Sequence, residues 1–87
     1  MRRDSTRVIY DILVLAERGA SKTQIVYRGN LNFRFAGPYI DLLLERDLVR
    51  LESKAAGRVP SYHLTERGVR FLRLLSQVEA ELVGFSP

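Results

Sequence analysis

The sequence predicts one small α+β domain that is mostly helical. Its 87 residues fall below the usual range for a domain, and 46% of them are hydrophobic, as in ordinary globular chains. Apolar residues recur at helical spacing in residues 4–18, 33–46 and 66–83. Two short β-prone runs, 48–51 and 61–64, lie between the last two of these segments. We therefore expect helices on both sides of a β-hairpin.

Capping residues delimit the first two helices. Asp4 or Ser5 can cap the start of the first helix, and Gly19 is placed to end it in the left-handed conformation. Residues 21–24 then form a capping-box pattern, in which a Ser hydroxyl and a Gln side chain satisfy amides at a helix start. A short second helix should follow and end near Arg28.

A third helix should run from Phe33 to Arg46, after the turn pair Gly29-Asn30 and the cap Asn32. Its inward stripe consists of Ala36, Ile40, Leu43 and Leu44. Gly37-Pro38 conflicts with this pattern, because proline lacks a backbone donor and its ring crowds the preceding turn. Either the helix is kinked there, which we favour, or its regular part begins near Ala36 with Pro38 in the first turn.

The last helix should begin after the cap Thr65 and end at Gly84. Its apolar residues form two stripes. The first can face the domain and consists of Val69, Leu72 and Ser76. The second follows the heptad spacing of a coiled coil and consists of Gly68, Phe71, Leu75, Val78, Leu82 and Phe85. A small monomer has no other surface to cover this second stripe, so its five large residues, Phe71 to Phe85, are the predicted homodimer interface.

Three helices closed by a β-hairpin are the element order of a winged helix-turn-helix. Residues 1–64 would form that domain, and residues 65–87 would form a dimerisation helix packed on it. In such domains the third helix is offered to the major groove of DNA, and the tip of the hairpin, or wing, reaches the flanking backbone.

Three segments resemble a known family: residues 20–33, residues 39–49, and the run Tyr62-His63-Leu64-Thr65-Glu66-Arg67-Gly68. They are similar to the small archaeal winged-helix proteins, and the resemblance covers residues 7–83. It implies a DNA-binding protein, chromatin-associated or regulator-like, that dimerises through an antiparallel coiled coil of its C-terminal helices. The sequence departs from that family at Gly37-Pro38, where relatives commonly carry basic or long polar residues.

The charge distribution also favours an anionic partner. Fourteen Lys and Arg against ten Asp and Glu give a formal net charge of +4, and residues 74–87 contain no base. The expected DNA contacts around the second and third helices are Lys22, Thr23, Tyr27, Arg28, Asn30, Asn32 and Arg34. Lys54 and Arg58 flank the wing tip and are the expected contacts there. The competing interpretation is a solvated polar face.

Several classes of function are not expected. The chain has no Cys and one His, which excludes disulfide, zinc-finger and iron–sulfur frameworks, and its carboxylates form no catalytic set. We therefore expect no enzyme, cofactor, metal or evident small-molecule ligand. No run of 18 apolar residues predicts a membrane span, so we expect a cytoplasmic, nucleoid-associated protein.

The expected function is that of a homodimer that binds double-stranded DNA mainly through phosphates, as a transcriptional regulator or chromatin-associated factor. Base readout should be limited, because Gly37 and Pro38 offer bases no polar side chain. The alternative is a winged helix that contacts protein or RNA in a larger assembly. Phe33, Phe35 and Tyr39 are expected in the core more than in base stacking, with Phe35 partly exposed.

Overall fold

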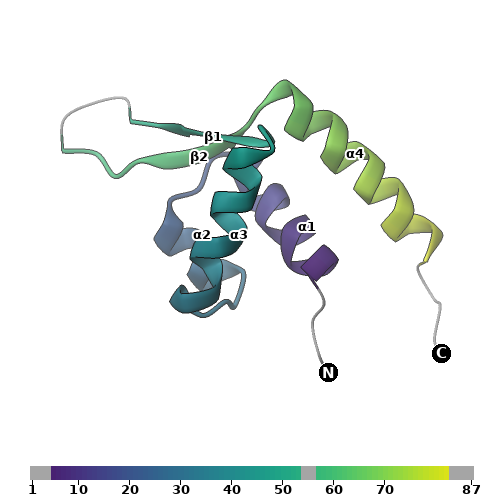
Figure 1. The fold of residues 1–87 in the computed structure, drawn as a ribbon, viewed down its shortest axis with the longest axis horizontal. Coiled ribbons are helices and arrows are strands. Elements are labelled where there is room, and N and C mark those ends of the chain that lie inside the picture. The colour runs from purple at the N-terminus through teal and green to yellow at the C-terminus, as the bar shows by residue number, and fades with distance from the viewer. Residues whose placement is uncertain (1–4, 54–56, 83–87) are drawn as a thin grey trace.

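Three helices, a two-stranded hairpin and a fourth helix follow one another in the computed structural model of Figure 1, which describes residues 5–53 and 57–82. The elements are α1 (Ser5–Ala16), α2 (Lys22–Arg28), α3 (Phe33–Glu45), β1 (Val49–Glu52), β2 (Ser61–Leu64) and α4 (Glu66–Glu81). This is the predicted mostly helical α+β fold.

The hairpin is antiparallel and extends away from the helices (Figure 1). Its register pairs Val49 with Leu64 and Glu52 with Ser61. Ala20, in the loop between α1 and α2, adds a further bridge, because it exchanges backbone hydrogen bonds of 3.0 and 2.7 Å with Tyr62. The base of the wing is therefore joined to the loop that leads into α2.

The core lies where α1 meets α2, α3 and the base of the hairpin. Its buried residues are Val8, Ile12, Leu13, Ala16, Ala20, Ile25, Val26, Ala36, Ile40, Leu43, Leu48, Val49 and Leu72. The predicted inward residues Ala36, Ile40, Leu43 and Leu72 belong to this set, because residues at spacings of three and four share one face of a helix. Leu44 is a correction: it is more than one-third exposed and is not part of the inward stripe.

The caps predicted at Gly19, Ser21, Asn32 and Thr65 are confirmed. Gly19 is left-handed, with a φ of 87°. The side chains of Ser21, Asn32 and Thr65 each accept a hydrogen bond from a backbone N–H of the following helix. Ser5 is the first residue of α1, whereas the alternative cap, Asp4, lies outside the described residues.

Helix α3 begins at Phe33 and continues through Pro38. The alternative of a regular helix that begins near Ala36 is therefore wrong. Pro38 lies in the second turn and has no N–H to donate to the Arg34 carbonyl, but the turns on either side retain helical structure. The kink that we favoured at this position stays a prediction.

Helix α4 packs beside α1 (Figure 1), with Gly68 and Leu72 buried and Leu75 packed against the core. Two expectations are corrected here. Val69 was expected to face the domain and is 44% exposed, whereas Gly68 was expected in the outer stripe and is buried. The side of α4 that faces the domain is thus rotated from the predicted one.

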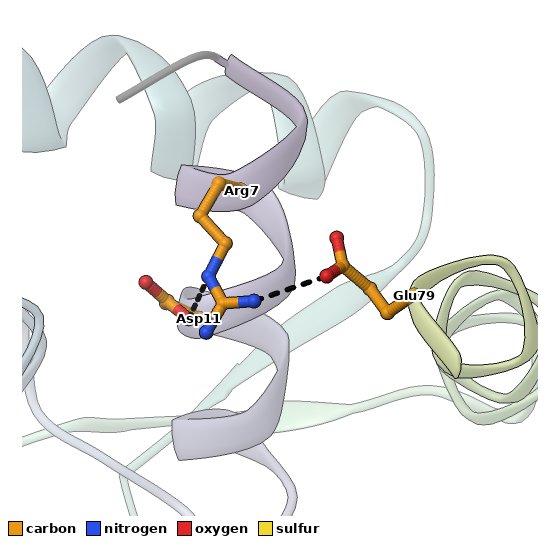
Figure 2. A network of polar contacts seen from close by, with 3 residues as sticks. All are labelled: Arg7, Asp11 and Glu79. Atoms are coloured by element: carbon orange, nitrogen blue, oxygen red, sulfur yellow. Dashed lines mark hydrogen bonds and ion pairs between the residues drawn. The ribbon is translucent and has the colours of Figure 1, made fainter. Parts of the chain in front are cut away.

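An ion pair joins the far end of α4 to α1. The Arg7 guanidinium lies 3.0 Å from the Glu79 carboxylate and 3.4 Å from that of Asp11, as Figure 2 shows. The same guanidinium lies 5.2 Å from the centre of the Tyr10 ring. Half of the Arg7 side chain is exposed, so water screens these pairs and each contributes little stability.

The near end of α4 is fixed by backbone contacts at the end of α3. The Thr65 hydroxyl donates to the Asp47 carbonyl and accepts from the Gly68 N–H at 2.9 Å, while the Thr65 N–H donates to the Leu48 carbonyl at 3.2 Å. Asp47 is left-handed, with a φ of 58°, which turns the chain from α3 into β1. A Cβ at Gly68 would lie only 1.9 Å from the Leu48 carbonyl oxygen. This contact requires glycine.

Replacing Gly68 by Ala should therefore lower the free energy of unfolding by about 3 kcal/mol, at the upper end of the usual overpacking penalty. Urea denaturation measures the change. Gln77→Ala, on the exposed side of α4, is the matched control and should stay within about 0.5 kcal/mol of the wild type. Equal stability of the two variants would contradict the close packing of α4 on Leu48.

Candidate nucleic-acid interface

The α2–turn–α3 unit is held by a tight turn. Gly29 caps α2 in a right-handed conformation, and Asn30 takes the left-handed one, with a φ of 52°. Asn tolerates this region better than most residues. The Leu31 N–H then donates to the Val26 carbonyl at 2.9 Å. Asn30 was predicted as a DNA contact, and the structure gives it, in addition, a backbone role in placing α3 across α2.

The N-terminal end of α3 attracts anions. The Asn32 side chain accepts a hydrogen bond of 2.9 Å from the Arg34 N–H, which orders the first turn. The Phe35 and Ala36 N–H groups both donate to the Asn32 carbonyl at 3.0 Å, and the helix dipole places positive potential at this end. Arg34 and Asn32 are exposed at this end. A phosphate at the start of α3 would meet the positive end of the helix dipole and the Arg34 guanidinium together.

Lys22 lies against the exposed flank of α3. A Cβ built on Gly37 would lie 3.8 Å from the Lys22 ammonium nitrogen, and no other atom counted there lies within 4 Å. The ammonium group from α2 therefore sits beside the middle of α3. Thr23, the next residue of α2, is exposed as well.

Arg28 lies elsewhere on α2. Its side chain lines a shallow depression with Arg7, Tyr10 and Asp11 of α1. Lys22 and Arg28 are six residues apart, about 9 Å along a helix axis, and lie on different sides of α2. The predicted basic cluster is thus divided into a part beside α3 and a part beside α1.

Exposed aromatic side chains surround this end of the domain. Tyr27 is 86% exposed, and Phe33 and Phe35 are 59% and 58% exposed. Partial exposure of Phe35 was expected, but the core position expected for Phe33 is wrong. Tyr39 is half-buried, with its hydroxyl 3.1 Å from that of Ser5. Phe33 precedes the inward stripe of α3, and periodicity alone could not show that no element covers it.

The second half of α3 has the opposite charge. Asp41 and Glu45 are both exposed, and they follow Arg34 at spacings of seven and eleven, which place all three on one face of the helix. Pro38, also exposed, separates the base from the acids. Only the first half of the exposed face of α3 is therefore suited to a polyanion.

The wing contributes Arg58, which is exposed, whereas Lys54 lies outside the described residues. At the base of the wing, His63 is half-buried, with Nε2 2.8 Å from the Ser61 hydroxyl and 3.3 Å from the Glu52 carboxylate. Arg50 lies 2.6 Å from the same carboxylate. The His63–Glu52 contact joins the two strands, whereas the other two contacts each lie within one strand.

A second exposed surface runs along α4 and consists of Phe71, Leu74, Val78 and Leu82, which we call the α4 stripe. Leu75, predicted for this surface, is partly buried against the core, and Phe85 lies outside the described residues. Leu74 is 63% exposed and was missed by the sequence analysis. A strict heptad assignment selected Leu75, because it could not show which side of α4 packs on α1.

Two further classes of site find no support within the described parts of the chain. No group of three His, Cys, Asp or Glu side chains there could hold a metal ion. No helix among residues 5–53 and 57–82 has the length and apolar character needed to cross a bilayer.

Comparison with known proteins decides the family. A family model described as winged helix-turn-helix matches residues 2–82. This chain is a member of the winged helix-turn-helix family. No curated protein matches its sequence.

Solved structures share this winged helix-turn-helix fold at low sequence identity. Sso10a-2, a DNA-binding protein from Sulfolobus solfataricus, is 20% identical, with a TM-score of 0.72 over 93% of this chain and 86% of its own. The transcriptional regulator BldR from the same organism is 22% identical, with a TM-score of 0.79 over 87% of this chain and 56% of its own. Lactococcus lactis ZitR in complex with DNA is 18% identical, with a TM-score of 0.72 over 95% and 57%. This chain thus spans little more than half the length of the latter two.

Gly37→Ala should raise the free energy of unfolding by about 0.5–1 kcal/mol, because glycine inside a helix is less stable than alanine by that amount. The new Cβ would meet only the flexible end of Lys22, at an ordinary contact distance of 3.8 Å. Chemical denaturation measures the change. Gly29→Ala is the contrasting control, since its Cβ would lie 2.6 Å from the Ile25 carbonyl oxygen and should destabilise the fold. Destabilisation by Gly37→Ala would mean that packing requires this glycine.

Proposed function

We propose that the protein is a homodimer that binds duplex DNA mainly through phosphate contacts, as a transcriptional regulator or chromatin-associated factor. The observation that carries the proposal is the first half of α3, where Arg34 is exposed at the start of the helix and the Lys22 ammonium of α2 lies beside Gly37. In winged helix-turn-helix domains this unit is offered to the major groove.

Charge and fold both support this assignment. Residues 20–44 contain Lys22, Arg28 and Arg34 but only one acid, Asp41. Arg58 adds a cation on the wing, where the DNA backbone would pass. Among proteins of this fold, Sso10a-2 is a DNA-binding protein and ZitR forms a complex with DNA. These likenesses concern the fold, so they support the proposal by analogy.

Phosphate contact should dominate over base readout. The exposed face of α3 offers Arg34 at its start, then Pro38, then Asp41 and Glu45. Carboxylates repel phosphates, and a proline ring donates no hydrogen bond. Sequence preference would then come from the start of α3, from the wing or from DNA deformability.

The α4 stripe supports the homodimer. Its four apolar side chains are exposed in the single chain, and a second copy of α4 would cover them. The charges on α4 favour an antiparallel pair, because Arg67, Arg70 and Arg73 occupy its first half and Glu79 and Glu81 its second. Antiparallel helices place the basic half of one copy beside the acidic half of the other.

The aromatic side chains favour an RNA-binding alternative. Tyr27, Phe33 and Phe35 are exposed beside Arg34, and exposed aromatics with neighbouring cations stack unpaired bases. Competition between duplex DNA and single-stranded RNA of equal length discriminates the two functions. Preference for RNA, with loss on Phe33→Ala and Phe35→Ala, would replace the duplex assignment.

Replacing Arg34 and Arg58 by Ala should weaken binding to duplexes of unrelated sequence by similar factors. It should also make the log–log salt slope shallower by about 1.8 units, since each lost phosphate contact removes about 0.9. Fluorescence anisotropy between about 50 and 200 mM salt measures both. Arg18→Ala with Arg46→Ala removes the same charge from exposed positions outside both proposed interfaces and should leave the slope nearly unchanged. Similar slopes for the two double variants would place the binding surface elsewhere.

Leu74→Glu with Val78→Glu should convert the proposed dimer into a monomer, because two carboxylates per copy would be buried without partners in the pair of α4 helices. Light scattering or sedimentation measures the mass, with circular dichroism as the check on folding. Gln77→Glu with Ala80→Glu adds the same charge to exposed positions outside the stripe and should keep the dimer mass. A Leu74→Glu, Val78→Glu protein of unchanged mass would exclude the α4 stripe as the interface.

A further inference from the structure

No packing contact of α3 requires the glycine at position 37. It lies inside α3, in a conformation that other residues adopt, and a Cβ there would meet only the Lys22 ammonium nitrogen, at 3.8 Å. Gly29 and Gly68, by contrast, each face a backbone carbonyl that excludes a side chain. The bare position at Gly37 therefore matters for the exposed surface of α3 and not for its core.

The side chain that reaches this bare position comes from α2. Lys22 is the first residue of α2, and the capping box fixes its backbone: the Gln24 N–H donates to the Ser21 hydroxyl at 3.2 Å, and the Ser21 N–H donates to the Gln24 side-chain oxygen at 3.0 Å. Ile25, one turn later, is fully buried and anchors α2 in the core. The backbone position from which the Lys22 side chain reaches Gly37 is therefore fixed.

The ammonium group is available to an outside ligand. Lys22 is exposed, and no described residue forms an ion pair with it within 4.0 Å. Asp41 lies one turn beyond Gly37 on α3, which leaves the ammonium group between Arg34 and the acidic half of the helix. A lysine ammonium is a compact charge with three donors, suited to a phosphate oxygen or to the acceptor edge of guanine.

We propose that Lys22 takes the place of a recognition-helix side chain at position 37: the ammonium group from α2 contacts the duplex at the middle of α3, and Gly37 leaves the room for it. This inference rests on the proposed duplex-binding function and adds the residue that supplies the central contact. Lys22 would supply a cation where Gly37 and Pro38 themselves offer bases no polar side chain.

A double-mutant cycle tests the placement. Lys22→Ala should lower duplex affinity about five- to tenfold near 0.1 M salt and make the salt slope shallower by about 0.9. Gly37→Arg in the Lys22→Ala background should restore most of that loss, because it puts a cation of α3 at the same place. In the wild-type background Gly37→Arg should gain little, since Lys22 already occupies the position. This non-additivity is the signature of a shared site.

Gly37→Ala in the Lys22→Ala background is the matched control, because it adds helix propensity without charge. It should not restore affinity. Thermal melts confirm that all variants fold. Equal gains from Gly37→Arg in the two backgrounds would mean that any added charge helps, and would overturn the placement of Lys22.

The remaining outcomes are also decisive. Loss of affinity by similar factors on unrelated duplexes assigns the contact to phosphate, and loss confined to duplexes with guanine at one position assigns it to a base; both support the proposal. Unchanged affinity of Lys22→Ala, in a protein that still binds duplex with a steep salt slope, would overturn the inference alone. Absence of salt-dependent duplex binding by the wild type would instead overturn the proposed function.

Discussion

Gly68 lets α4 touch the backbone at the point where α3 ends and β1 begins. A Cβ would lie 1.9 Å from the Leu48 carbonyl oxygen, and Thr65 hydrogen-bonds to the carbonyls of Asp47 and Leu48 beside it. Three elements meet at this contact: α3, the wing and α4. Their relative directions are fixed there by backbone atoms, which leave less freedom than side-chain packing would.

The same contact determines what α4 presents outward. With Gly68 on Leu48 and Leu72 in the core, the Arg7–Glu79 pair lies on the side toward α1, and the α4 stripe is left on a neighbouring side. In the proposed homodimer, α4 would therefore pack on its own domain with one side and on a second copy with the α4 stripe. Contacts from α4 to α3 would then fix the positions of the two α3 helices relative to each other.

Local patterns in the sequence predicted most of the fold. The caps Ser21, Asn32 and Thr65 and the turn at Gly19 depend on residues within four positions, so the pattern predicted them. The exposure of Phe33, the exchange of Leu74 for Leu75 and the position of Lys22 beside Gly37 depend on how one helix is rotated against another. That rotation is decided by long-range packing, which residue spacing along a single helix does not record.

Ala20 connects two parts of the proposed interface. Its backbone pairs with Tyr62 at the base of the wing, and Ser21, the next residue, caps α2 directly before Lys22. The wing and the start of α2 are therefore ordered together when the chain folds. The conformational entropy of aligning them is lost in folding and not in binding, so a duplex would meet an interface that is already pre-organised.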